Sequence, residues 1–182
     1  MRGGSLNEMR VLAYCDQSFE IVTRKVAGGD ALVITCPPTF GAEFVARSKQ
    51  VIEAADLIIF NFDAVPNRTA WYLQNGEQVI AADQLNGLDL SRAVIFLMNC
   101  YQGGAVLNTL KAQRPKAIIG GAGENLGGQT KPVGTDIMAL WFRRWLTVGL
   151  SPARALEMAK ARLKIGAQTA SVKDAQKFEV IV

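Results

Sequence analysis

Residues 56–63 read DLIIFNFD, and this stretch is the strongest indication of the fold. It is mostly apolar on both faces, rich in β-branched and aromatic side chains, and carries an aspartate at each end. A short run of this kind is typical of a parallel strand that helices cover on both sides. We therefore expect a buried strand here, in the middle of an α/β domain.

Further runs of the same type lie before and after it along the chain. They span residues 10–16, 31–36, 93–100, 116–120 and 178–182. Apolar residues at helical spacing fill several of the intervals, over residues 39–55, 105–113, 135–148 and 151–163. The alternation of strand and helix predicts one α/β domain over residues 1–182, with a mostly parallel central sheet. Helices on both faces would make it a three-layer sandwich.

A hairpin is expected between the strands at residues 56–63 and 93–100. Asn75-Gly76 is among the strongest short indications of a tight β-turn, and it stands between residues 71–74 and 78–81. We therefore predict a β-hairpin insertion near residues 71–81.

The composition is that of a folded globular domain. Of the 182 residues, 49% are hydrophobic and 20% are charged, which gives no basis for extended disorder. The net charge of +4 permits an acidic partner without requiring one. Cationic residues gather late in the chain, where solvated helix faces explain them better than a nucleic-acid surface. They are Arg143, Arg144, Arg154, Lys160, Arg162, Lys164, Lys173 and Lys177.

The sequence also bears on the compartment. No run of about 18 or more apolar residues is present, so we expect no membrane-spanning helix. The three cysteines, Cys15, Cys36 and Cys100, fit neither a metal motif nor a disulfide framework. Reduced thiols and a cytoplasmic location are therefore the expectation. The sequence indicates no cofactor and no metal site.

The chain contains no histidine. This excludes a Ser-His-Asp triad, a Cys-His dyad and histidine-ligated metal sites within the chain. A second copy of the chain cannot supply the missing group either, because every copy lacks it.

Three acidic residues follow predicted strands and are candidates for a site. Ligands of open α/β sheets bind at the carboxyl ends of the strands, and Asp16, Asp63 and Glu124 stand at or after three such ends. Their carboxylates are expected either to bind a basic side chain or to cap turns, and binding of a metal ion such as Mg²⁺ is the least favoured alternative.

Cys100 is the candidate nucleophile. It ends the predicted strand at residues 93–100, directly after Asn99, and Gly103-Gly104 follows just before a predicted helix. The free amides and the dipole at a helix N-terminus favour a thiolate and can line an oxyanion hole. A buried structural cysteine is the alternative interpretation.

Residues 120–128 read GGAGENLGG and invite a phosphate-loop interpretation. The segment lacks the Gly-Lys-Ser/Thr ending of a P-loop, and from Gly121 its spacing is GxGxxxG rather than GxGxxG. A loop that rims a cleft is the better interpretation, and nucleotide binding is the alternative.

Several of these segments together resemble the CHAT domains, a family of caspase-like cysteine peptidases. Residues 93–104 (AVIFLMNCYQGG) resemble the nucleophile segment of that family, and residues 55–64 (ADLIIFNFDA) resemble the strand that ends in its His-Gly. Residues 116–120, 135–149 and 151–163 resemble its later strand and helices. The resemblance implies a caspase-like fold with a substrate cleft.

The resemblance also implies roles for single residues. The nucleophile position falls on Cys100, the oxyanion turn includes Gly103, and the histidine position falls on Asp63. An acidic S1 pocket, which caspase-like enzymes often have, would favour Lys or Arg. The expected substrate-binding residues are Asp16, Asn99 and, for that acidic pocket, Glu124 or Asp136.

Three hypotheses for the function follow. The first is a catalytically degenerate domain that binds a peptide or protein partner, because Asp63 is too weak a base to replace imidazole and would raise the pKa of a nearby thiol. The second is an active cysteine endopeptidase or acyl-transfer enzyme that uses Cys100 with an unusual base. The third is a small-ligand or nucleotide-binding protein that uses residues 120–128.

Overall fold

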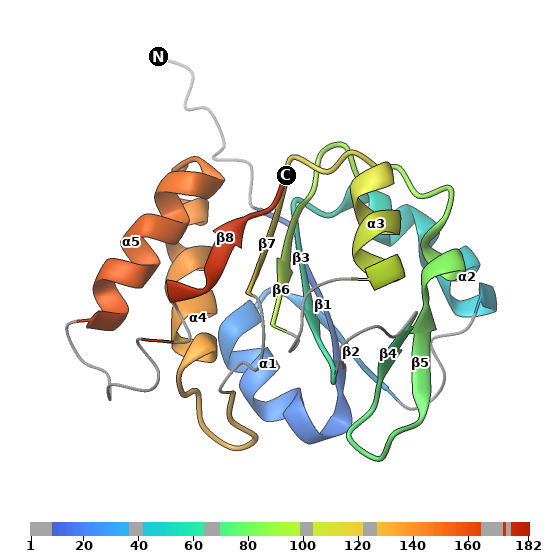
Figure 1. Cartoon of the computed structure of the whole chain (residues 1–182), viewed down its shortest axis with the longest axis horizontal. Coiled ribbons are helices and arrows are strands. Elements are labelled where there is room, and N and C mark those ends of the chain that lie inside the picture. The colour runs from blue at the N-terminus through green and yellow to red at the C-terminus, as the bar shows by residue number, and fades with distance from the viewer. Residues whose placement is uncertain are drawn as a thin grey trace.

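The computed structural model describes residues 9–36, 42–63, 70–98, 104–121, 127–164, 173 and 176–182. These residues form an α/β domain around a six-stranded sheet with strand order β2-β1-β3-β6-β7-β8 (Figure 1). All neighbouring strands are parallel except β8, which runs antiparallel to β7. The strands are β1 (Val11–Asp16), β2 (Leu32–Cys36), β3 (Leu57–Asn61), β6 (Val94–Leu97), β7 (Ala117–Gly121) and β8 (Phe178–Val180). The predicted α/β class and mostly parallel sheet are confirmed.

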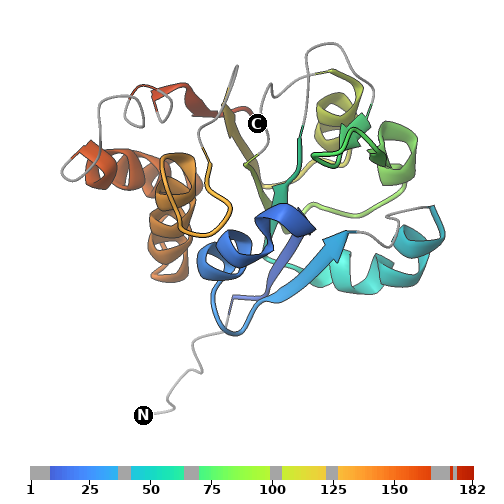
Figure 2. The same cartoon turned by 90° about the horizontal axis from the view of Figure 1, so that it is seen from below.

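Helices cover both faces of the sheet, as Figures 1 and 2 show. The helices α1 (Glu20–Ala27), α4 (Thr135–Thr147) and α5 (Pro152–Lys164) lie on one face. The helices α2 (Ala42–Ala54) and α3 (Gly104–Ala112) lie on the other.

The side chains of the strands pack into two separate hydrophobic cores, because successive side chains point to opposite faces of the sheet. In β3, Leu57 and Ile59 pack with α1, α4 and α5, whereas Ile58 and Phe60 pack toward α2 and α3. All four side chains are almost completely buried. A strand that is buried on both faces accounts for the continuous apolar run in the sequence.

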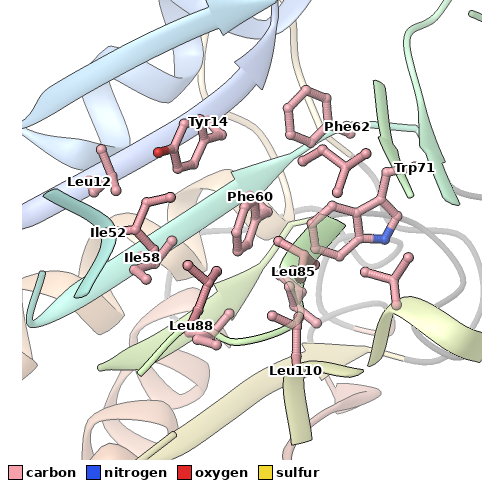
Figure 3. Packing of buried hydrophobic residues seen from close by; sticks show 14 of the residues in the cluster. Leu12, Tyr14, Ile52, Ile58, Phe60, Phe62, Trp71, Leu85, Leu88 and Leu110 are labelled. Atoms are coloured by element: carbon pink, nitrogen blue, oxygen red, sulfur yellow. The ribbon is translucent and has the colours of Figure 1, made fainter. Parts of the chain in front are cut away.

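The predicted hairpin is present and consists of β4 (Ala70–Tyr72) and β5 (Gln78–Ala81). Its turn uses Asn75, whose side chain accepts a hydrogen bond from the Glu77 N–H at 2.9 Å, and Gly76, which has a φ of +87°. A positive φ is easy for glycine because it has no Cβ. The ring of Trp71 packs beside those of Phe60 and Phe62 and closes one core (Figure 3).

The helix α1 was not predicted from the sequence. Its buried side chains include Val22, Thr23 and Val26, which are β-branched residues with little intrinsic preference for helix. Tertiary contacts stabilise the helix instead. One of them is a hydrogen bond of 2.7 Å from the Nε of Arg143 on α4 to the Val26 carbonyl oxygen. A cation at this end also complements the helix dipole.

The strand β3 ends at Asn61, two residues earlier than predicted. Asp63 leaves the sheet and pairs with Tyr72 of the hairpin through two backbone hydrogen bonds of 2.9 and 3.0 Å. The main-chain groups of Asp63 are therefore used by the hairpin rather than by the central sheet. The strand β8 is likewise shorter than its predicted range of residues 178–182.

Two short 3₁₀ helices, η1 (Gln17–Phe19) and η2 (Ala82–Leu85), complete the described elements. Among the described helices, none has the length and apolar character needed to cross a membrane.

The packing of α4 on the sheet gives a test of the fold. The ring of Phe142 is fully buried and lies 5.0 Å, centroid to centroid, from that of Phe96 on β6. We expect Phe142→Ala to lower the free energy of unfolding by about 3–5 kcal/mol, because it leaves a cavity in the core. Urea denaturation measures the change.

A matched control is Ile21→Ala on α1, where the side chain is 53% exposed. We expect this change to alter the free energy of unfolding by about 0.5 kcal/mol or less. Equal losses in the two variants would contradict the described packing.

Candidate functional site

A cavity of about 280 Å³ lies at the carboxyl ends of the central strands. The strand β1 pairs with β2 on one side and with β3 on the other. The order in which strands are added to the sheet therefore reverses between β1 and β3, which makes this a topological switch point. Open α/β sheets bind ligands in the crevice at such a switch point. The cavity is lined by Phe19, Asn61, Phe62, Asp63, Gln74, Met98, Gly127, Gly128, Gln129 and Asp136.

The described lining of the cavity is acidic. Asp63 and Asp136 contribute carboxylates, and no Lys or Arg is present among the described lining residues. Asn61, Gln74 and Gln129 add side-chain amides. This arrangement suits a ligand group that is positively charged and donates hydrogen bonds.

Asp136 organises one wall of the cavity. It lies in the first turn of α4 and is buried, and its Oδ2 accepts hydrogen bonds from the N–H of Gly128 at 2.6 Å and of Val133 at 3.0 Å. Gly128 has no space for a side chain, because a Cβ there would collide with the carbonyl oxygen of Lys131. Burial raises the pKa of Asp136 to about 6, against the lowering effect of the two hydrogen bonds.

Asp63 also lines the cavity, is half-buried and lies just after β3. Within the described residues, its carboxylate accepts no hydrogen bond, although its backbone is fixed to Tyr72. Burial, and then the negative charge of Asp16, raise the pKa of the Asp63 carboxyl. Such a carboxylate gains from a cationic ligand, which would offset both effects.

Asp16 has a different role. Its Oδ1 accepts from the Ser18 N–H at 2.7 Å, and its Oδ2 accepts from the Gln74 N–H at 2.6 Å. It thereby caps η1 and ties the hairpin turn to the end of β1. It lines a separate pocket of about 310 Å³, together with Leu73 and Asn75, rather than the cavity. The turn-capping interpretation left open by the sequence describes these contacts.

Three amide side chains at the cavity were missed by the sequence reasoning. The Nδ2 of Asn61 donates to the Thr23 Oγ1 at 3.0 Å in the buried interior, and the Nε2 of Gln129 donates to the Gln74 Oε1 at 3.0 Å. The second bond joins the hairpin turn to the segment after β7. Asn61 could have been noticed as the polar residue near the end of an otherwise apolar run.

Four sequence-predicted site residues lie outside the described residues. They are Asn99, Cys100, Gly103 and Glu124. Their described neighbours in the sequence, Met98 and Gly127, line the cavity.

The other two cysteines are buried free thiols. Burial raises the pKa of Cys15 to about 11 and that of Cys36 to about 12. Because the thiolate is the reactive form, both are expected to be inert at neutral pH.

Within the described ranges, no group of three or more Cys, Asp or Glu side chains is arranged to hold a metal ion. A comparison with models of known protein families gives no match, and a comparison with curated proteins gives none either.

The titration of Asp136 gives a second test. Its pKa is about 6 in the folded protein, against an ordinary value of 3.8. The folded state therefore holds this proton more tightly, and the resulting stabilisation, complete below about pH 4, is lost as the pH rises through 6. Relative to Asp136→Asn, the wild type should lose about 2 kcal/mol of unfolding free energy between pH 4 and 7.

Urea denaturation at a series of pH values measures this difference. Asp83→Asn is the control, because it removes an exposed acid outside the cavity lining. If the wild type and Asp136→Asn differ by a constant amount at every pH, the raised pKa of Asp136 is refuted.

Proposed function

We propose that this chain is a caspase-like domain of the CHAT type that lacks peptidase turnover and binds a basic residue of a peptide or protein partner in the cavity. The observation that carries the proposal is the place of Asp63. It lies on the cavity lining just after β3, at the position that the resemblance assigns to the catalytic histidine. A carboxylate there keeps the cleft but changes its chemistry from proton transfer to cation binding.

The architecture supports this proposal. A mostly parallel sheet with helices on both faces and a hairpin after β3 is what the resemblance implies. Met98, two residues before Cys100 in the sequence, lines the same cavity as Asp63. The histidine position, Asp63, is thus on the cavity lining, and the nucleophile position comes two residues after another lining residue in the sequence.

The chemistry supports binding over turnover. A cysteine peptidase needs a base that accepts the thiol proton and returns it to the leaving amine, and the chain has no histidine for this task. A carboxylate near a thiol opposes a second negative charge and raises the thiol pKa. Among the described lining residues, the second hypothesis, an active thiol enzyme, would have to use Asp63 or Asp136 as its base, and the Asp136 carboxylate already accepts two backbone hydrogen bonds.

The size and charge of the cavity indicate the ligand. Its volume of about 280 Å³ is slightly below the roughly 300–1,000 Å³ of pockets that enclose drug-sized molecules. One extended side chain of a peptide fits this scale better than a whole cofactor does. Two carboxylates and three amides on the lining favour an Arg or Lys side chain.

Nucleotide binding through residues 120–128 has less support. The N–H of Gly128 donates to the Asp136 carboxylate and is therefore not directed at a phosphate. Two acidic side chains on the same lining would also repel a phosphate group.

A cytoplasmic location belongs to this proposal as well, since Cys15 and Cys36 are buried free thiols.

Peptide binding tests the ligand class. We expect a short acetylated peptide with one central arginine to bind more tightly than the same peptide with citrulline, its neutral isostere. Asp63→Asn should weaken binding of the arginine peptide by about tenfold, since a charge-assisted hydrogen bond is lost. Isothermal titration calorimetry measures both affinities.

Asp83→Asn again serves as the control, since it removes one exposed carboxylate at a distance from the cavity lining. It should leave the affinity unchanged. Equal affinity for arginine and citrulline peptides would exclude cation recognition, and a thermal shift with nucleotides instead would favour the third hypothesis.

Thiol reactivity tests the assignment of Cys100 and Asp63. With Cys15→Ala and Cys36→Ala in the background, iodoacetamide should alkylate Cys100 with an apparent pKa at or above the ordinary value of about 8.5. Asp63→His should lower that pKa by about one unit or more, because an imidazolium near the thiol favours the thiolate.

Asp83→His is the matched control and should change nothing. An apparent pKa well below 8.5 in the Asp63 parent would support the active thiol enzyme. An Asp63→His variant that behaves like the parent would show that position 63 is not near Cys100.

A further inference from the structure

A second surface with unusual chemistry lies on the α4–α5 layer, on residues other than those of the cavity lining. The Cζ of Arg144 lies 4.8 Å from the centroid of the Trp141 ring, and the Cζ of Arg162 lies 4.9 Å from the same centroid. Arg144 is one turn further along α4, and Arg162 comes from α5. We name these three residues the Arg–Trp–Arg cluster.

The two guanidinium groups are exposed and held in place. Trp141 is partly buried against the core, whereas Arg144 and Arg162 are exposed. Cation–π contact with an anchored ring restricts two long side chains that would otherwise sample many rotamers. The planar donor forks are thereby organised before any ligand arrives, which lowers the entropic cost of binding.

The cluster has a surplus of positive charge. Residues 135–164 contain six Arg or Lys and only two acidic residues. Asp136 is buried at the start of α4, and Glu157 pairs with Arg154 at 2.7 Å. Among the ion pairs of the described residues, none includes Arg144 or Arg162.

We propose that the Arg–Trp–Arg cluster is a docking site for an acidic peptide segment of a partner protein. Two guanidinium forks match the bidentate geometry of Asp and Glu carboxylates. The site also provides the positive charge that an acidic segment requires for attraction and orientation.

A peptide fits the cluster better than a nucleic acid does. Proteins that bind single-stranded nucleic acids use exposed aromatic rings on which bases stack. The Trp141 ring is less accessible to a base, because it already contacts two guanidinium groups. Nucleic-acid binding also depends on many phosphate contacts along a track. Lys160, on the same helix as Arg162, is instead turned toward the Gln176 carbonyl oxygen and Glu179.

This site is independent of the cavity. The cavity has acidic lining and is proposed to take a basic side chain, whereas the cluster is cationic and takes carboxylates. The two can therefore fail separately in experiments.

The test uses a fluorescein-labelled peptide of alternating glutamate and glycine and the full-length chain, with fluorescence anisotropy as the readout. We expect binding at low salt that weakens as NaCl is added. The double variant Arg144→Gln/Arg162→Gln should bind about tenfold more weakly, because two charged donors are lost. Trp141→Leu should also weaken binding although it retains both charges, because the guanidinium groups lose the ring that orders them.

Arg154→Gln is the matched control, since it removes one exposed arginine of α5 outside the cluster. It should change the affinity by less than about twofold. Asp63→Asn, which is expected to weaken the arginine peptide at the cavity, should not weaken binding of the glutamate peptide at the cluster. Urea denaturation of each variant separates lost binding from lost folding.

Three results would overturn the proposal. The first is no binding of the glutamate peptide by the wild type at low salt. The second is equal weakening by Arg154→Gln and by the cluster variants, which would show that only net charge matters. The third is tighter binding of a single-stranded oligonucleotide of the same charge, which would assign the surface to nucleic acid.

Discussion

The parallel pairing of β1 with β3 is the contact on which the remaining structure depends. Leu12 lies beside Ile58 and Tyr14 beside Phe60, and the two aromatic rings stack with centroids 5.7 Å apart. Because β2 pairs with the other side of β1, this contact places the switch point of the sheet between the first two core strands. It also aligns their carboxyl ends, where the acidic residues of the site follow.

The sheet was predictable because a strand that is buried on both faces appears in the sequence as a short continuous apolar run. Each central strand is a short apolar run, and the hairpin is marked by Asn75-Gly76. The helix α1 has no such pattern, since its β-branched residues favour a strand locally and its position depends on Arg143, far along the chain. Strand ends were also imprecise, because the partner of Asp63 is a hairpin residue rather than a neighbour in the central sheet.

The site was predictable only in part, because an aspartate near the end of an element can either accept hydrogen bonds from nearby backbone N–H groups or remain available to a ligand. The sequence identified Asp16 and Asp63 by residue type and by their places near strand ends, whereas Asp136 came only from the resemblance to caspase-like enzymes with an acidic S1 pocket. The sequence does not show that the carboxylates of Asp16 and Asp136 each accept hydrogen bonds from two backbone N–H groups, whereas the Asp63 carboxylate accepts none within the described residues. That division of roles depends on loops that approach from distant parts of the chain. The hydrogen bond from the Gln129 side-chain amide to that of Gln74 cannot be predicted from the sequence for the same reason.

The hairpin β4–β5 is connected to the site more closely than an insertion usually is. Its turn donates the Gln74 N–H to Asp16 at the end of β1, and the Gln74 side chain accepts from Gln129 beyond β7. Evolution can therefore reshape the cavity by altering the length or turn of a surface hairpin, while every strand of the central sheet stays unchanged. Specificity in such a protein can diverge faster than its fold, and two relatives with the same sheet need not share a ligand.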